Sequence, residues 1–333
     1  MQKNYGIKFL SIGAALPSKV VKNTDLEKLF ETSDEWIYTR TGIRERRIIG
    51  ENESGLSLSV SAAKKALKAA KFNPNDIDLI IVCTATSDKL YPTMSCMLQG
   101  EIGADKAVSF DLSAACSGFI FGLVTAAQYI YNGTFKNVLI VGVDVHSRFL
   151  DWSERSVAIL FGDGAGAILL TSCMARDDEL IGYQINSEAD KNLDLNLNNE
   201  NITFNDFKKQ INPNFVRMNG KAIYQFALRV VPDVVTKLLD KLNLKPSQID
   251  YFIPHQANQR IIDAVSQRLT FTDKQTISNI EKVGNTSSAS IPLAIVDGLK
   301  SGEIVVPGKM LLVGFGAGLT WGAAVINPSF ICD

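Results

Sequence analysis

One cysteine of the chain occupies a position suited to nucleophilic chemistry. Cys116 ends the apolar run AVSFDLSAAC and is followed by SGFIFGLVTAAQYIYNG. The first segment is typical of a buried strand, and the second is typical of a helix, with Phe119, Leu123 and Ala127 at helical spacing. A helix N-terminus favours negative charge, so this position predicts more thiolate than the roughly 3% that a thiol of pKa about 8.5 has at pH 7. A buried structural cysteine is the alternative, and position alone does not separate the two.

The other four cysteines of the 333-residue chain give no comparable signal. Cys83 lies within the apolar run LIIVCTAT and is expected in the core. No Cys-X-X-Cys pair or Cys/His cluster has the spacing of metal ligands, so the sequence predicts neither a metal site nor a disulfide framework. This cysteine usage favours a reducing compartment, and therefore a cytoplasmic location.

Composition and charge exclude several classes of function. The chain is 46% hydrophobic and 21% charged, with a formal net charge of −1, so neither nucleic acid nor an anionic membrane is expected as a partner. No apolar run approaches the about 18 residues of a transmembrane helix. Residues 6–16 are expected to form a first β-strand and not a signal peptide, because Lys8 interrupts the apolar stretch and Pro17 follows it.

Two stretches of the chain, 172 positions apart, resemble each other. Residues 71–84 read KFNPNDIDLIIVCT, and residues 243–256 read NLKPSQIDYFIPHQ. Each stretch follows an amphipathic segment and enters an apolar one, and the same offset carries Cys116 onto Ser288 in a second turn of small residues. The pattern predicts a duplicated α/β unit whose equivalent turns meet at the centre of the molecule. Chance similarity is the alternative.

Each half also has a glycine-rich segment next to a strand. These segments are FGDGAGAILL at 161–170 and GFGAGLTWGAAVI at 314–326. Neither places G-x-G-x-x-G between a first strand and a helix, so tight turns are expected and not phosphate-binding loops. Residues 174–215 fit neither half and hold eight asparagines between 192 and 214, which predicts a surface loop or a cap over a site.

A histidine and an asparagine complete a possible catalytic set. His255 follows an apolar run in PHQANQRI, and Asn285 lies in VGNTSSAS, at the turn equivalent to that of Cys116. If the halves pack with pseudo-twofold symmetry, these three residues meet at the centre. The order Cys, His, Asn also occurs in papain-like peptidases, but their C-G-[SA]-C-[WY] signature is not the SAACSGF found here. His146 has no partner motif, and a structural role is expected for it.

Six segments in order resemble the β-ketoacyl-acyl-carrier-protein synthase III family, the initiating condensing enzymes of the thiolase superfamily. The segments are SDEWIYTRTGIRERR, DLSAACSGF, FGDGAGA, PHQANQRI, VGNTSSASIP and GFGAGLTWGA. The resemblance implies an α/β thiolase-like fold, with two pseudo-symmetric halves forming a layered αβαβα core. It places the nucleophile half at 1–173, a linker or cap at 174–215, and the half with histidine and asparagine at 216–333.

The resemblance also implies a reaction. This is the decarboxylative Claisen condensation of a short acyl-CoA, such as acetyl-CoA, with malonyl-acyl carrier protein, which starts fatty-acid synthesis. One alternative is a pathway-specific homologue that makes a specialised ketide or transfers acyl groups. Another is a thioesterase or peptidase that releases the acyl group to water.

Catalytic roles follow from the same resemblance. Cys116 takes the acyl group from its CoA thioester, and His255 and Asn285 donate hydrogen bonds to the enolate formed when malonyl carrier protein loses CO₂. The backbone N–H groups of Cys116 and Ala317 form the oxyanion hole. No metal and no other cofactor is implied, since the departing CO₂ leaves the carbanion and CoA enters only as part of the substrate.

The resemblance assigns binding residues in three groups. Those expected to bind CoA are Trp36, Arg40, Arg155 and Asn258. Those expected to meet the carrier protein or a phosphate are Arg260, Arg268 and Lys221. Those expected in the acyl pocket are Phe161 and Tyr91, and Tyr91 reaches the pocket of the partner subunit in a homodimer.

Departures from the family pattern bear on substrate choice. Ala317 replaces a common glycine, so its φ must suit a residue with a Cβ. Tyr91 stands where phenylalanine is frequent, which could alter the choice of primer. Gln225 and Gln267 replace basic residues expected at the carrier-protein surface, so carrier binding is expected to be weaker or differently placed.

Overall fold

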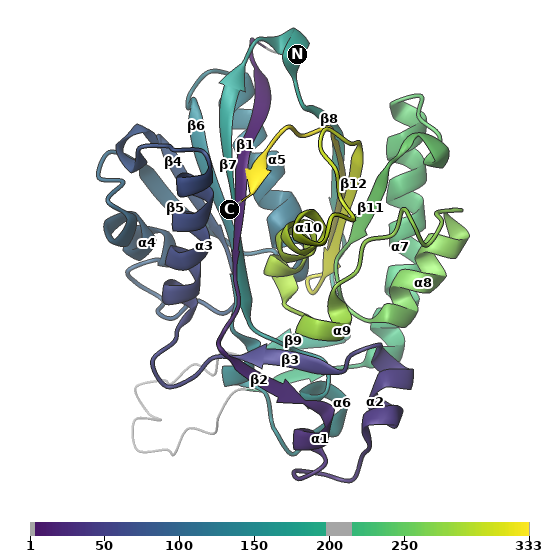
Figure 1. Ribbon diagram of the computed structural model, residues 1–333. Helices are drawn as coiled ribbons and strands as arrows, with labels where there is room; N and C mark the ends of the chain where they lie inside the picture. Colours follow the sequence, from purple (N-terminus) through teal and green to yellow (C-terminus); the bar gives the residue numbers. More distant parts are fainter. Residues whose placement is uncertain (1–3, 198–214, 333) are drawn as a thin grey trace.

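The structure is a computed structural model that describes residues 4–197 and 215–332. Two β-sheets stand side by side with helices between them and on both outer sides (Figure 1). From one outer side to the other, the layers are α3 and α4, the first sheet, α5 and α10, the second sheet, and α7 and α8. This is the αβαβα architecture that the family resemblance implied.

The first sheet runs in the order β14-β1-β7-β6-β4-β5. Its strands are β1 (Gly6–Ala15), β4 (Leu79–Cys83), β5 (Val108–Leu112), β6 (Asn137–Asp144), β7 (Gly164–Cys173) and β14 (Ile331–Cys332). Every residue of β4 is buried, as expected for a strand that is covered by helices on both faces. The predicted strand at 6–16 is confirmed, ending one residue early.

The second sheet repeats part of the first. It runs in the order β11-β12-β13-β8, with the strands β8 (Leu180–Ser187), β11 (Tyr251–Pro254), β12 (Met310–Gly316) and β13 (Thr320–Ile326). The pairings are parallel for β11 with β12 and antiparallel for the rest. The series β4-β6-β7-β1 of the first sheet has the same sequence of parallel and antiparallel pairings.

The helices differ in composition according to their layer. The central helices α5 (Gly118–Tyr131) and α10 (Ser290–Ser301) are mostly buried, because a sheet lies on each side of them. The outer helices each cover one sheet face with an apolar stripe. They are α3 (Gly55–Ala69), α4 (Met94–Ile102), α7 (Gly220–Lys241) and α8 (Gln259–Arg268).

Shorter elements gather at the lower end of the layers in Figure 1 and share a separate apolar cluster. They are α1 (Asn23–Leu26), α2 (Asp34–Thr41), α6 (Arg155–Ala158), β2 (Lys19–Lys22), β3 (Glu45–Ile48), β9 (Leu195–Leu197) and β10 (Val216–Met218). A further short helix, α9 (Ile280–Val283), contacts β3 from the second half. In Figure 1 these elements lie below the central helices.

Details of the backbone follow the 172-residue repeat. The 3₁₀ turns Pro74–Asp76 and Pro246–Gln248 correspond, as do Ala115–Ser117 and Ser287–Ala289. Lys71 and its equivalent residue Asn243 both have positive φ, at 50° and 53°. The predicted duplication is therefore present in the backbone conformation as well as in the sheets.

One sequence prediction is wrong in part. Residues 180–187 were expected within a linker or cap, but they form β8, the edge strand of the second sheet and the counterpart of β1. The strand is half-exposed along much of its length, so its apolar alternation in the sequence is weak. Residues 198–214 of the expected cap lie outside the described residues, and the division into halves at 173 and 216 stays a prediction.

Two features of the described residues bear on classes of function. None of the described helices is both long and apolar enough to cross a membrane. Within residues 4–197 and 215–332, no group of three or more His, Cys, Asp or Glu side chains is placed to hold a metal ion.

Candidate active site

Cys116 lies where the sequence predicted, between a strand and a helix. Strand β5 leads into the 3₁₀ turn Ala115–Ser117, and α5 begins at Gly118. The side chain is 5% exposed and lines a cavity of about 100 Å³. A nucleophile in this position could be reached only by a thin chain that enters the cavity.

The same cavity brings together the three residues of the predicted catalytic set. Cys116, His255 and Asn285 all line it, although they come from three separate turns at the ends of central elements. Most of the remaining wall is apolar, which favours an acyl chain and disfavours water. These wall residues are Leu160, Phe161, Leu195, Met218, Ile223, Tyr224, Ala257, Ile261 and Phe315.

His255 is held rigidly and stays neutral. It follows β11, its backbone N–H donates to the Val313 carbonyl at 2.7 Å, and its Nδ1 lies 2.7 Å from the Ser290 hydroxyl. Burial lowers the pKa of the His255 imidazole to about 3. Because Ser290 engages Nδ1, the other ring nitrogen, Nε2, is the one left for chemistry in the cavity.

Asn285 is fixed through both its backbone and its side chain. Its N–H donates to the Leu160 carbonyl at 2.9 Å, and its carbonyl accepts from the Gly162 N–H at 3.0 Å. Its Oδ1 accepts from the Ser287 N–H at 2.9 Å. This hydrogen bond to Oδ1 orients the side-chain amide, so the amide nitrogen is a rigidly held donor.

The electrostatic prediction for Cys116 is wrong in direction. The helix start was expected to increase the thiolate fraction, but burial raises the pKa of the Cys116 thiol to about 12. The Ser287 hydroxyl opposes this shift by donating to the sulfur at 3.3 Å. The thiol is therefore neutral at pH 7, because burial removes the water that would stabilise the thiolate.

A buried carboxylate beside the site gave no signal in the sequence. Asp144, at the end of β6, is fully buried and accepts from the Ser288 N–H at 3.1 Å and the Ser288 hydroxyl at 2.8 Å. It also accepts from the hydroxyls of Thr84 and Thr86. Since Ser288 is the repeat equivalent of Cys116, this network ties the second small-residue turn to the first half of the chain.

The residues expected to bind CoA form one surface cluster around Trp36. The guanidinium carbon of Arg155 lies 4.4 Å from the centre of the Trp36 ring, and that of Arg40 lies 5.8 Å from it. Asn258 lines the cavity and donates from its side-chain nitrogen to the Arg40 carbonyl at 3.2 Å. The cluster therefore connects with the cavity that holds Cys116.

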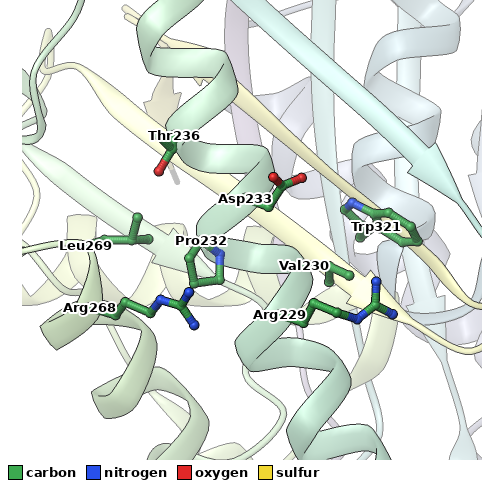
Figure 2. A pocket seen from close by; sticks show the side chains of 8 residues that line it. All are labelled: Arg229, Val230, Pro232, Asp233, Thr236, Arg268, Leu269 and Trp321. Carbon is green, nitrogen blue, oxygen red and sulfur yellow. The ribbon is translucent and has the colours of Figure 1, made fainter.

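The three basic residues predicted for the carrier protein differ in their surroundings. Lys221 and Arg260 are exposed near the N-terminal ends of α7 and α8. Arg268, at the end of α8, donates to the Leu228 carbonyl of α7 at 2.9 Å. Pro232 lacks an N–H and leaves that carbonyl without its helical partner, so Arg268 links the two helices (Figure 2).

The residues expected in the acyl pocket and the oxyanion hole lie in different surroundings. Phe161 is buried in the cavity wall and stacks on His146, with ring centres 4.6 Å apart. Tyr91 is 86% exposed and does not line this chain's own cavity. Ala317 lies in the turn between β12 and β13 without positive φ, whereas Gly318 has φ 132°.

The expectation of tight turns is confirmed for the second glycine-rich segment, where residues 317–319 form a turn, but the first segment has no turn. One segment enters β7 and the other forms the β12–β13 hairpin. Gly316 is packed so closely on Cys116 that a Cβ there would lie 2.9 Å from the Cys116 Cβ. The glycine thus permits the hairpin to approach the nucleophile.

A duplicated αβαβα core with cysteine, histidine and asparagine at one cavity defines a condensing enzyme of the thiolase class. Comparison with known proteins narrows this class. The family model described as 3-oxoacyl-[acyl-carrier-protein] synthase III matches residues 110–189, and the model for its C-terminal part matches residues 239–327.

Relatives with curated names cover nearly the whole chain. A β-ketoacyl-[acyl-carrier-protein] synthase III of Trichormus variabilis is 46% identical over 98% of this chain and 99% of its own length. A chloroplastic enzyme of the same name from Arabidopsis thaliana is 43% identical over 97% of this chain and 83% of its own length. The chain belongs to the β-ketoacyl-acyl-carrier-protein synthase III family.

Solved structures agree with this assignment. The crystal structure of a 3-oxoacyl-[acyl-carrier-protein] synthase III from Aquifex aeolicus is 39% identical, covers 97% of this chain and all of its own, and has a TM-score of 0.89. The enzyme from Pseudomonas aeruginosa is 36% identical over 98% of this chain and 99% of its own, with a TM-score of 0.90. The protein is thus an acyltransferase that carries out the initiating condensation of fatty-acid synthesis.

Proposed function

We propose that Cys116, His255 and Asn285 divide the condensation of a short acyl-CoA with malonyl-acyl carrier protein into two half-reactions. The observation that carries this proposal is that all three side chains line a single, largely apolar cavity. The cavity is small, at about 100 Å³, which favours a short primer such as acetyl. The reaction needs no metal, since the departing CO₂ leaves its electron pair on the malonyl carbon.

In the first half-reaction, the sulfur of Cys116 attacks the thioester carbonyl of acyl-CoA. A new carbon–sulfur bond forms, the bond to the CoA sulfur breaks, and the proton of Cys116 ends on the CoA thiol. The N–H groups of Cys116 and Ala317 receive the oxyanion. Support comes from the close packing of Gly316 on Cys116, which brings the two turns together.

In the second half-reaction, malonyl carrier protein loses CO₂, and the resulting carbanion attacks the acyl group on Cys116. The bond between the acyl carbon and the Cys116 sulfur breaks, and the released thiolate takes a proton from solvent. The enolate oxygen receives hydrogen bonds from His255 Nε2 and the Asn285 amide nitrogen. The Ser290 hydroxyl can donate to Nδ1, which places the imidazole proton on Nε2. Fixed neutral donors in a dry site stabilise the enolate without reorganisation.

The Trp36 cluster is proposed to hold the nucleotide end of CoA. The planar indole and the guanidinium groups of Arg40 and Arg155 suit stacking on adenine and pairing with phosphate. Asn258 lies between this cluster and the cavity, where the pantetheine arm would pass. The exposed Arg260 and Lys221 are the proposed contacts of the acidic carrier protein, together with Arg268, whose guanidinium is already bonded to α7.

A homodimer in a reducing cytoplasm is also proposed. Strand β5 is the outer edge of the first sheet, and its Val108 is 51% exposed. The apolar side chains of Leu90 and Tyr91 are 81% and 86% exposed. An unpaired strand edge with protruding apolar residues favours association with a second copy, which would bring Tyr91 to the partner's acyl pocket.

A panel of acyl-CoA primers with malonyl carrier protein tests the function. The proposal predicts 3-ketoacyl carrier protein and CO₂ as products, with turnover falling as the primer lengthens. Free acid as the main product would instead indicate a hydrolase, and an acylated acceptor without CO₂ would indicate simple acyl transfer.

A further inference from the structure

Ser287 lies between two of the proposed catalytic residues and has no assigned role. Its side chain is 1% exposed. Its hydroxyl donates to the Cys116 sulfur at 3.3 Å, and its backbone N–H donates to Asn285 Oδ1 at 2.9 Å. One residue therefore contacts both the nucleophile and a proposed enolate donor.

The backbone of Ser287 adopts a conformation that is unfavourable for a residue with a Cβ. Its φ is 52°, in the left-handed region, and its repeat equivalent Ala115 has φ 46°. Such strain persists only where surrounding structure enforces it, and it is frequent at functional sites. Here the conformation directs the hydroxyl toward the sulfur of the opposing turn.

The repeat shows that this contact is not shared by the neighbouring serine. Ser288 is the equivalent of Cys116, but its hydroxyl donates to the Asp144 carboxylate at 2.8 Å and to the Cys83 carbonyl at 2.9 Å. Within the described residues, the Ser287 hydroxyl is the side-chain donor that reaches the Cys116 sulfur.

We propose that Ser287 is a catalytic residue of the acylation half-reaction, whose hydroxyl stabilises the Cys116 sulfur as negative charge develops on it. The inference rests on the proposed function of Cys116. As the carbon–sulfur bond to the acyl group forms, the thiol proton passes to the departing CoA sulfur, and Ser287 keeps its own proton throughout. The hydroxyl therefore acts only by donating a hydrogen bond.

The electrostatics of the cavity give this bond a function. Burial raises the pKa of Cys116 to about 12, and the Ser287 hydroxyl is the principal group that opposes the increase. Hydrogen bonds to charged groups are stronger than those to neutral ones, so the contact strengthens as the sulfur becomes anionic.

Two variants test the proposal. Ser287→Ala and Ser287→Gly both lose the hydroxyl and keep the N–H that binds Asn285, while glycine also relieves the backbone strain. The first measurement is the rate of Cys116 alkylation by iodoacetamide between pH 7 and 9, resolved by peptide mass spectrometry. Both variants should be slower at every pH by roughly threefold to tenfold, because loss of the hydrogen bond raises the pKa of the Cys116 thiol, and the greater reactivity of the remaining thiolate offsets only part of that effect.

The second measurement separates acylation from decarboxylation, a step that places no charge on the Cys116 sulfur. Single-turnover acetylation by acetyl-CoA should slow in both variants, whereas release of CO₂ from malonyl carrier protein on the preformed acyl-enzyme should stay within about twofold of the wild type. Ser59→Ala is the matched control, because it loses a buried hydroxyl outside the site. This control should leave the reactivity of Cys116 unchanged.

Equal alkylation rates in the wild type and both variants would overturn the proposal. An equal loss of acylation and of CO₂ release would also overturn it, because that result indicates a disordered turn. Failure of the proposed function is recognised separately, since it would appear as wild-type protein that acetyl-CoA does not label on Cys116.

Discussion

The proposed role of Asn285 leads to a sharp prediction about the two half-reactions. Replacing Asn285 by Ala removes the amide that is proposed to bind the enolate. The backbone of the turn should stay in place, because its bonds to Leu160 and Gly162 do not involve the side chain. Asn285→Asp is the isosteric companion, which keeps the Oδ1 acceptor for Ser287 and replaces the donor by an oxygen.

The size of the effect follows from the number of donors. Loss of one oxyanion-hole donor costs about 10²–10³ in rate, or about 2.7–4 kcal/mol. His255 remains as the second donor, so condensation should fall by this amount and not vanish. Asn285→Asp should lose at least as much, because a carboxylate repels the enolate. Acylation of Cys116 should change little in Asn285→Ala, since the enolate does not yet exist, whereas the carboxylate of Asn285→Asp should also slow acylation by opposing negative charge on the Cys116 sulfur.

Rapid-quench kinetics with intact-mass detection measures each half-reaction. Acetyl transfer to the protein is followed first, and then loss of the acetyl group with release of CO₂ after malonyl carrier protein is added. An Asn285→Ala variant that acylates as poorly as it condenses would refute the division of roles.

His255→Ala belongs in the same series, because the neutral imidazole could also accept the proton of the neutral Cys116 thiol. Abolished acylation in that variant would assign His255 as a base.

Four further outcomes are expected. Trp36→Ala should raise the KM for acetyl-CoA roughly tenfold with kcat little changed, as for loss of one stacked base, and steady-state kinetics checks this. Arg268→Met should lower the free energy of unfolding by about 1 kcal/mol, because the Leu228 carbonyl loses its donor, and urea titration measures it. Val108→Glu should weaken the homodimer in sedimentation experiments; wild-type protein that is active as a monomer would contradict that assembly. Burial lowers the pKa of His255 to about 3 from an ordinary value near 6.5, so the unfolded chain binds the proton more tightly than the folded protein does. The contribution of His255 to the free energy of unfolding should therefore be full above pH 6.5 and decline from there toward pH 3. Urea titration at several pH values should show less of this decline in His255→Asn.

Local chemical signals in the sequence were enough to locate the centre of the site. The small residues around Cys116 and the 172-residue offset predicted two equivalent turns that meet, and both turns are present. His255 and Asn285 were recognised because each follows a strand or turn with the same pattern in both halves. Periodicity and repetition are visible in the amino-acid sequence, so they can be recognised without knowledge of the packing.

Properties that arise from packing were not predictable. The contact of Asp144 with the turn at Ser288 could not be predicted, because it joins residues from different halves of the chain. The thiol pKa was predicted in the wrong direction because the helix start is visible in the sequence, whereas burial is not. Strand β8 was missed because a half-exposed edge strand has a weak apolar pattern.

The central claim is that Cys116 carries the acyl group between the two half-reactions, and a pulse-chase labelling experiment tests it most directly. The protein is incubated with labelled acetyl-CoA, and the adduct is mapped by peptide mass spectrometry before and after malonyl carrier protein is added. The account predicts label on Cys116 alone, no label in Cys116→Ser, and transfer of the label into 3-ketoacyl carrier protein during the chase. Label on Cys83 or Cys96 that persists in Cys116→Ser, or label that leaves Cys116 only as free acetate, would contradict it.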